Sequence, residues 1–231
     1  MFFQSLTLIL LVFLCTHLSV SAETRQFHNA DQSKSFFAEL THYDFEHQQV
    51  SVKMKNGRKQ HFPINILSEI DQKYVIENGK RLAINKDVRV TLKRFNHPSK
   101  KSDEGGVVNR IYPTGYSISL NNRAKRAYTK ISLNYTIYYA VQGYLDPQRE
   151  QKIISGTLTC KKITALEKIS LKTQTIDIIT GKSDPVYDDD GNLIQPEGRR
   201  KDLVLGCKVD LLVGGEIVKS ITDGTIGIKK L

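Results

Sequence analysis

The 231-residue chain has no tryptophan, two methionines and three cysteines. Without tryptophan, the core cannot be built around the buried Trp that characterises antibody domains. No CxxC pair occurs, and this spacing excludes a zinc ribbon and a redox dithiol motif. Histidine is absent after His97. The long C-terminal part of the chain therefore cannot hold a Ser-His-Asp or Cys-His nucleophile system by itself.

Other catalytic signatures are also missing. The sequence contains no GxSxG elbow, HExxH helix, phosphate loop or dinucleotide fingerprint. Four histidines lie early in the chain, but no two of them share a spacing typical of metal ligands, so surface or hydrogen-bonding roles are favoured over a metal site. They are His28, His42, His47 and His61. We therefore expect no catalytic residue, cofactor site or metal site, and a protein that is not an enzyme.

One acidic cluster, Asp188-Asp189-Asp190-Gly191-Asn192, allows two interpretations. Carboxylate and amide oxygens are the ligands that calcium prefers, but a calcium loop needs carboxylates at alternate positions and a distal Glu. Here three carboxylates are adjacent, and Asp-Gly and Gly-Asn are ordinary turn-forming pairs. A solvated turn is the favoured interpretation. A hydrolase with paired carboxylates is the least favoured function, because nothing places two acids across a cleft.

Residues 1–22 resemble a signal peptide. An apolar run at residues 6–14 is followed by Val20-Ser21-Ala22, the small residues that a signal peptidase requires. The run is too short to span a bilayer as a stable helix, and an uncleaved anchor is the alternative. We therefore expect an exported protein, periplasmic, cell-surface or secreted, with no membrane span after cleavage. Cys160 and Cys207 would remain, either as a disulfide or as buried free thiols.

The net charge of +10 is concentrated in one part of the chain. Residues 23–80 are balanced, residues 81–130 carry an excess of +9, and residues 131–231 an excess of +1. Candidate anion-binding residues in this segment are Arg123, Lys125, Arg126, Lys100 and Lys101. If their two loops meet, they form a patch that attracts polyanions, whereas a spread charge would only aid solubility.

Residues 50–75 hold the most specific local signals. Val50 and Val52 alternate towards Asn56-Gly57, and Phe62 and Ile64 alternate away from it. These residues share one face only if the turn has an odd number of residues, and a three-residue turn with Gly57 in the left-handed conformation satisfies this. Ser68 is a predicted N-cap, with Asp71 as the acidic partner of a capping box. The following helix is predicted to carry Ile70 and Tyr74 on one face and to stop at Asn78-Gly79.

The same region carries a family resemblance. Its matching residues are Arg25-Gln26-Phe27, Ala38-Glu39, Val50, Val52, Asn56-Gly57, Pro63-Ile64, Leu67-Ser68, Asp71-Gln72 and Tyr74-Val75. Residues 25–75 resemble the SHD module, an SH3-like homology domain first described in a yeast endocytic adaptor and found in many exported bacterial proteins. Phe27 departs from the Trp usual in the bacterial pattern, and no glycine lies near Ser33. The resemblance implies a five-stranded SH3-like barrel and, by analogy with the adaptor, peptide binding.

Beyond residue 80 the pattern is almost wholly of period two. Alternating apolar sets occur at residues 88–92, 131–139, 154–160 and 203–213. These sets predict seven or eight half-buried antiparallel strands, which favours an immunoglobulin-like β-sandwich. Long loops are expected at residues 96–106, 121–127 and 183–201. The Gly214-Gly215 turn predicts a hairpin that places Leu211 against Val218 and Leu212 against Ile217.

We therefore expect an all-β protein with a signal peptide at residues 1–22, an SH3-like barrel at 23–80 and a β-sandwich at 81–231. The preferred function is non-enzymatic binding of a protein or peptide at the cell envelope or outside the cell. The alternative is binding of an anionic polymer, such as a polysaccharide, lipopolysaccharide or nucleic acid, through residues 81–130.

Overall fold

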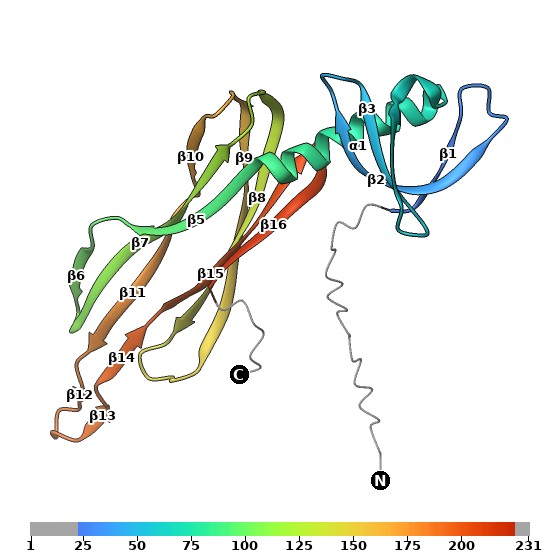
Figure 1. Cartoon of the computed structure of the whole chain (residues 1–231). Coiled ribbons are helices and arrows are strands. Elements are labelled where there is room, and N and C mark those ends of the chain that lie inside the picture. Colours follow the sequence, from blue (N-terminus) through green and yellow to red (C-terminus); the bar gives the residue numbers. More distant parts are fainter. Residues whose placement is uncertain (1–22, 225–231) are drawn as a thin grey trace, which may run out of the picture.

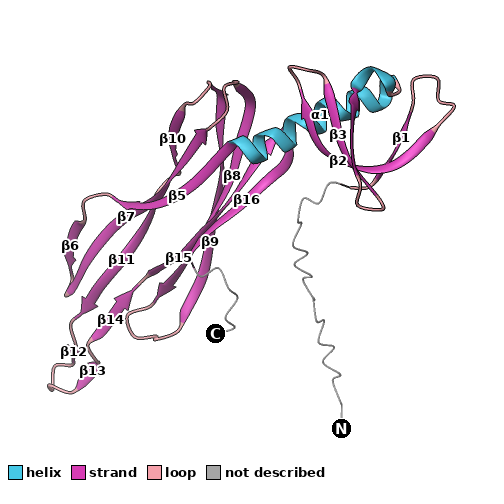
Figure 2. Ribbon diagram, viewed as in Figure 1, coloured by secondary structure: helices cyan, strands magenta, loops and turns pink. Residues whose placement is uncertain are grey.

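The computed structural model describes residues 23–224, so the predicted signal peptide lies outside the described residues. Strands dominate this part of the chain, which confirms the expectation of a mostly β protein. The molecule is elongated, with a small sheet at one end, two larger sheets at the other and helix α1 (Glu69–Asp87) between them (Figures 1 and 2). No helix among residues 23–224 is both long and apolar enough to cross a bilayer.

The small sheet has four antiparallel strands in sequence order, not the five that the resemblance implies. They are β1 (Arg25–His28), β2 (Ser35–Asp44), β3 (Gln49–Met54) and β4 (Lys59–Pro63), followed by the 3₁₀ turn η1 (Ile64–Ile66). Their buried side chains form one compact core around Phe27, Leu40 and Val50. This core is closed on one side by α1, which packs against β2.

The predicted β3–β4 hairpin is confirmed. The Met54 amide donates to the Arg58 carbonyl at 2.8 Å, which leaves a turn of three residues. Gly57 in this turn has a φ of 80°, the left-handed conformation that glycine adopts without a steric penalty. Val50 lies opposite Phe62 in the register, so both strands present their apolar residues to the same core.

Helix α1 starts at the predicted cap. The Ser68 hydroxyl accepts a hydrogen bond from the Asp71 amide at 3.3 Å. The capping box is incomplete, because the Ser68 amide donates to the His28 carbonyl instead of to Asp71. The Asp71 carboxylate accepts bonds from the Ser68 hydroxyl and the His28 amide, both at 2.8 Å. The cap therefore also ties strand β1 to the helix.

The predicted helix stop at Asn78-Gly79 is wrong, because α1 continues to Asp87. Gly79 does not have a positive φ, so it is not a helix-ending glycine. It lies instead where α1 contacts Tyr43 of β2. A Cβ at this position would lie 2.6 Å from the Tyr43 Cβ, so only glycine allows α1 to pack this closely on β2. The domain boundary predicted between residues 80 and 81 thus falls inside a continuous helix.

Ile70 and Tyr74, which were predicted to share one face of the helix, do not define its buried stripe. Ile70 is 68% exposed, and the buried stripe follows Val75, Gly79 and Ala83 instead. Val75 belongs to the core of the small sheet, whereas Ala83 and Ile84 belong to the core of the larger sheets. One helix therefore contributes to two cores, which its local sequence does not reveal.

The larger sheets contain more strands than predicted. One sheet is organised around the long central strand β7 (Val107–Asn122), which pairs with two shorter strands along each edge. Its partners are β5 (Val88–Asn96) and β6 (Lys100–Glu104) on one edge, and β10 (Lys168–Lys172) and β11 (Ile176–Ser183) on the other, with β14 (Gly198–Lys201) beyond β11. Two predicted loops therefore contain strands, namely β6 within residues 96–106 and, within residues 183–201, β12 (Val186–Tyr187), β13 (Leu193–Gln195) and β14.

The second large sheet has four antiparallel strands in the order β16-β15-β8-β9. They are β8 (Tyr128–Gln142), β9 (Arg149–Ile163), β15 (Leu203–Val213) and β16 (Glu216–Gly224), while β12 (Val186–Tyr187) and β13 (Leu193–Gln195) form a separate hairpin. Buried residues of both larger sheets form one continuous core, as in a β-sandwich. The predicted loop at residues 121–127 joins the two sheets between β7 and β8.

The predicted alternation holds along most strands but breaks in β15. Ile131 and Leu133 of β8 and Val209 of β15 all point into the core and are fully buried. A bulge at Leu205 interrupts the pairing of β15 with β8. Val204, rather than Leu203 or Leu205, therefore packs against the core.

The hairpin at Gly214-Gly215 has the predicted two-residue turn. Leu212 lies opposite Ile217 as expected, but Leu211 lies opposite Lys219 rather than Val218. A bulge between Leu211 and Leu212 shifts the register by one residue. Val218 is only 3% exposed, so the shift keeps this side chain inside the core.

The disulfide between Cys160 and Cys207 does not form, and both cysteines are free and buried. Both lie in the same sheet, where Cys160 is opposite Ile131 and Cys207 is opposite Ile137 on the two sides of β8. The six-residue offset along β8 is about 20 Å, far beyond the reach of a disulfide. Burial raises the pKa of Cys160, and raises that of Cys207 to about 12.

Candidate binding sites

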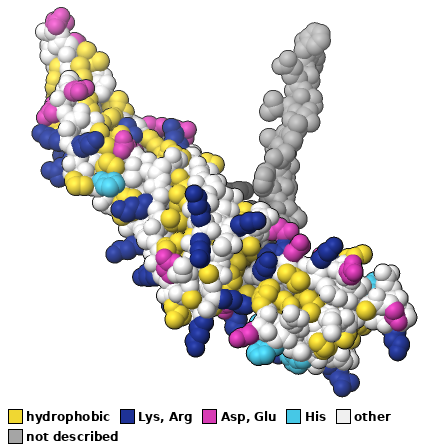
Figure 3. Space-filling model, turned by 90° about the horizontal axis from the view of Figure 1, so that it is seen from above, with side chains coloured by type: hydrophobic (Ala, Val, Ile, Leu, Met, Phe, Trp, Pro, Cys, Tyr) yellow, Lys and Arg dark blue, Asp and Glu magenta, His cyan; other side chains and the backbone are white. Residues whose placement is uncertain are grey.

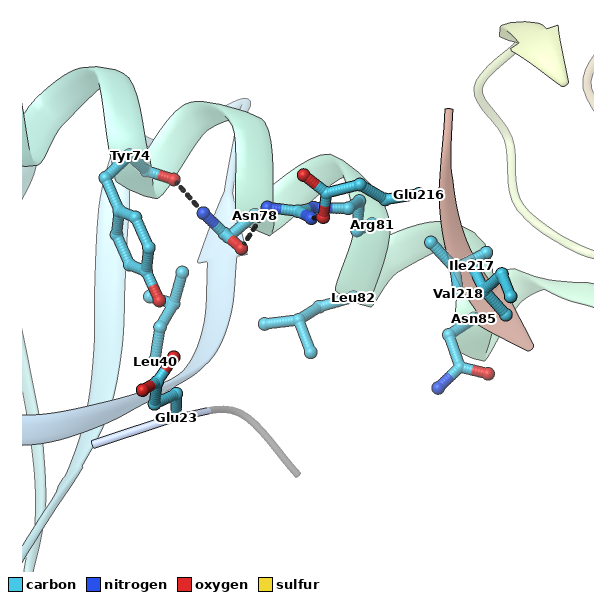
Figure 4. A pocket seen from close by; sticks show the side chains of 10 residues that line it. All are labelled: Glu23, Leu40, Tyr74, Asn78, Arg81, Leu82, Asn85, Glu216, Ile217 and Val218. Atoms are coloured by element: carbon cyan, nitrogen blue, oxygen red, sulfur yellow. Dashed lines mark hydrogen bonds and ion pairs between the residues drawn. The ribbon is translucent and has the colours of Figure 1, made fainter. Parts of the chain in front are cut away.

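A cleft of about 300 Å³ lies where the small sheet, α1 and the β15–β16 hairpin meet. Figure 4 shows its lining side chains around the helix. Those from α1 are Tyr74, Asn78, Arg81, Leu82 and Asn85, those from the sheets are Leu40, Ile217 and Val218, and those at the rim are Glu23 and Glu216. The helix residues are spaced three or four apart, so they form one stripe along α1 that faces the cleft.

The lining is apolar in its depth and polar along the helix. Leu40 and Val218 are buried, while Ile217 is 42% exposed at the entrance. Asn78 donates from its amide to the Tyr74 carbonyl at 2.9 Å and accepts a bond from Arg81. Arg81 also forms an ion pair with Glu216, which joins the helix to the hairpin. The charges on this wall are therefore neutralised within the protein.

Tyr74 is fixed from behind by the small sheet. Its ring packs edge-on against Phe27, with the Arg25 guanidinium 4.3 Å from its centroid. Arg25 in turn donates to the Asp71 carboxylate at 2.9 and 3.0 Å. Burial raises the pKa of Asp71, but hydrogen bonds from the His28 amide, Ser68 and Arg25 outweigh it and hold the pKa below its ordinary value. The carboxylate thus stays charged and holds the cleft wall in place.

The five candidate anion-binding residues do not form one patch. Arg123, Lys125 and Arg126 lie in the loop after β7, whereas Lys100 and Lys101 pair with Ile111 and Arg110 near its other end. This part of β7 is about 35 Å long at the usual rise per residue. Figure 1 shows β6 far from the end of the sheet that α1 joins. The two predicted loops therefore do not meet.

The side chain of Arg126 is bound to other residues of the protein. It donates to the Asp87 carboxylate at 2.9 Å and to the Tyr128 hydroxyl at 2.7 Å, and Tyr128 donates to Asp87. Its guanidinium also lies 5.4 Å from the ring of Phe45 in the small-sheet region. Arg126 therefore links the end of α1, the loop after β7 and the small-sheet region.

This network also sets the ionisation of its members. Burial raises the pKa of Asp87, but the hydrogen bonds from Tyr128 and Arg126 outweigh it and hold the pKa below its ordinary value. Burial and the bond to Asp87 raise the pKa of Tyr128. Arg123 donates to the Lys86 carbonyl at 2.9 Å, so Lys125 is the one cation of the three whose side chain forms no hydrogen bond or ion pair with the described residues.

Basic residues outside the predicted set form a different surface. Arg89, Lys93, Lys168 and Lys172 lie on the outward side of β5 and β10, on either edge of β7. We call these four residues the basic face. Lys168 and Lys172 were missed because they fall outside the basic segment, although the alternation of Lys168-Ile169-Ser170-Leu171-Lys172 already marks which side chains point outwards.

The polar clusters considered from the sequence have structural partners. His47 contacts Asp44 at 2.9 Å and His61 contacts Ser51 at 2.8 Å. Asp188 accepts hydrogen bonds from the amides of Asp190 and Asn192, as a turn requires. Within residues 23–224, no group of three or more His, Cys, Asp or Glu side chains is arranged to hold a metal ion.

No protein-family model and no curated protein matches the chain. An X-ray structure of a Northeast Structural Genomics Consortium target is 15% identical and covers 64% of this chain and 94% of its own, with a TM-score of 0.24. DesR, a beta-glucosidase from Streptomyces venezuelae in complex with D-glucose, is 11% identical and covers 58% of this chain and 15% of its own, with a TM-score of 0.18. Such low scores support no conclusion about fold or function.

Proposed function

We propose that this is an exported, non-enzymatic binding protein that holds a peptide segment of a partner protein in the cleft beside α1. The observation that carries the proposal is the cleft itself, with an apolar depth, a polar wall and an open entrance. Its volume of about 300 Å³ is at the lower end of ligand pockets, enough for one or two side chains. The resemblance of residues 25–75 to a peptide-binding module, and the signal-like residues 1–22, support this proposal.

The geometry favours a peptide with an apolar anchor. Leu40, Leu82 and Val218 offer apolar surface in the depth, where an apolar side chain would lose contact with water. Arg81 is paired with Glu216, so the one cation that lines the cleft is not available to select an anionic anchor. Asn85 at the rim has an amide that could pair with a peptide backbone.

The test compares two isoleucines at exposed strand positions. Ile217→Glu places a charge in the cleft entrance, and Ile153→Glu makes the same change on β9, where Ile153 is 65% exposed and does not line the cleft. Peptides selected by the wild-type protein from a random library are then measured by calorimetry. We expect Ile217→Glu to weaken binding at least about tenfold and Ile153→Glu to leave it unchanged. Equal affinities for both variants, or no enriched peptide, would overturn the proposal.

A further inference from the structure

The outward side of β5, β7 and β10 carries a regular arrangement of cations. Arg89 and Lys168 flank Asn121 on the two sides of β7, and Lys93 and Lys172 flank Ser117 in the same way. Residues two strands apart are separated by about 10 Å, and the two rows by four residues or about 13 Å. The four cations therefore stand near the corners of a rectangle on a sheet surface.

The centre of this rectangle is rich in hydroxyl groups. Thr91, Ser119 and Ser170 form the row between the two pairs of cations. Ser117 and Ser170 are hydrogen-bonded to each other at 2.7 Å, which confirms that their side chains share this side of the sheet. Hydroxyls both donate and accept, so they can bind either the charged or the neutral oxygens of a ligand.

The positive charges of the basic face are not paired with acidic side chains of the described residues. All four cations are exposed, and none forms an ion pair with a described residue. No outward position of β5, β7 or β10 holds an acidic residue. In the view from above (Figure 3), Lys and Arg side chains are spread along the length of the molecule. Such a surface holds a positive potential that attracts anions.

An aromatic side chain borders the rectangle. Phe95 lies across Gly115, because a Cβ at Gly115 would come within 2.9 Å of its ring. The Lys172 ammonium is 5.3 Å from the Phe95 centroid, so this contact helps to position the cation at the edge of the face. Phe95 is half-buried and offers one apolar surface beside the charges.

We propose that the basic face binds an anionic polysaccharide. The Cα atoms of the four cations are about 10–13 Å apart, a spacing that spreads their charges over an area wider than one sulfate or phosphate. A chain with repeated anionic groups can contact several at once and releases counterions from each contact. The hydroxyl row suits the neutral oxygens of sugar rings. This site is separate from the cleft beside α1, so either proposal can fail without the other.

Nucleic acid fits this surface less well. Single-stranded nucleic acids are held by successive bases that stack on aromatic side chains, whereas the aromatic rings at the edge of this face, Phe95 and His97, pack against each other. Sequence reading in duplex DNA needs a helix or ribbon that enters a groove, whereas this surface is the flat side of a sheet. The observations therefore favour a polymer recognised through its charges and hydroxyls.

The test removes the four charges and keeps the side-chain length. The face variant is Arg89→Gln, Lys93→Gln, Lys168→Gln and Lys172→Gln, and its binding to fluorescent heparin is measured from 50 to 300 mM salt. We expect affinity at 100 mM salt to fall more than about tenfold, and the slope of log K against log salt to flatten by about three. Polygalacturonate and a polyphosphate chain then distinguish carboxylate and phosphate polymers from sulfated ones.

A matched control removes the same number of charges elsewhere. This control, which combines two residues of the loop after β7 with two of β6, is Arg123→Gln, Lys125→Gln, Lys100→Gln and Lys101→Gln, and we expect this loop variant to bind heparin within about threefold of wild type. Because all replaced side chains of the face variant are exposed, thermal unfolding should match wild type, and the double variant Lys93→Gln/Lys172→Gln provides a milder alternative. Equal losses in the face and loop variants would overturn the proposal. So would binding of single-stranded DNA that is tighter than binding of every polysaccharide.

Discussion

Two basic regions of the sandwich carry similar charge but differ in what surrounds them. In the loop after β7, Arg126 is bound to Asp87 and Tyr128, and Arg123 to the Lys86 carbonyl. On the basic face, no cation has an anionic partner among residues 23–224. In the loop, the cations are bound to groups of the protein and join α1 to the sandwich. On the basic face, the cations remain free to contact an anionic ligand. Charge counted along the sequence cannot separate these two roles.

The largest expected effect is on stability and comes from the loop. Arg126→Gln removes the main cation near the partly buried Asp87 and the contact with Phe45. We expect the free energy of unfolding to fall by about 1–2 kcal/mol, because a hydrogen-bonded charge pair at a partly exposed site is worth that much. Lys93→Gln likewise replaces a cation by a neutral amide, but on the basic face, and should alter the free energy of unfolding by less than about 0.5 kcal/mol. Urea unfolding of the two variants measures this difference, and equal losses of stability would contradict it.

A smaller effect concerns the pH dependence of that loss. The pKa of Asp87 is lowered in the folded protein, so its stabilising contribution is present above the unfolded pKa and is lost as the pH falls through the folded pKa. The destabilisation caused by Arg126→Gln should therefore be largest near pH 7 and shrink below about pH 4. Urea unfolding of wild type and variant at pH 7 and pH 3 measures this difference. A loss of equal size at both values would mean that the pairing with Asp87 does not stabilise the fold.

Features set by neighbouring residues were predictable from the sequence. The turn with Gly57 and the cap at Ser68 each depend on a few consecutive residues, and both were predicted correctly. Alternation placed Ile131 and Leu133 in the core because one side of each strand must face away from water.

Features set by distant contacts were not predictable. Gly79 signals a helix stop in isolation, but the side chain of Tyr43 lies against it, and the helix continues. The cleft exists only because the β15–β16 hairpin meets α1, and the basic face only because β10 and β5 pair with opposite edges of β7. Strand order of this kind is not encoded in any local pattern.

The most direct test of the comparison is to map which lysines a polyanion protects. Acetylation of the wild-type protein with and without saturating heparin, read by mass spectrometry, compares Lys93, Lys168 and Lys172 with Lys125. We expect the three lysines of the basic face to become protected at least about fivefold while Lys125 continues to react at its free rate. Protection of Lys125 with unchanged reactivity of Lys93, Lys168 and Lys172 would contradict it.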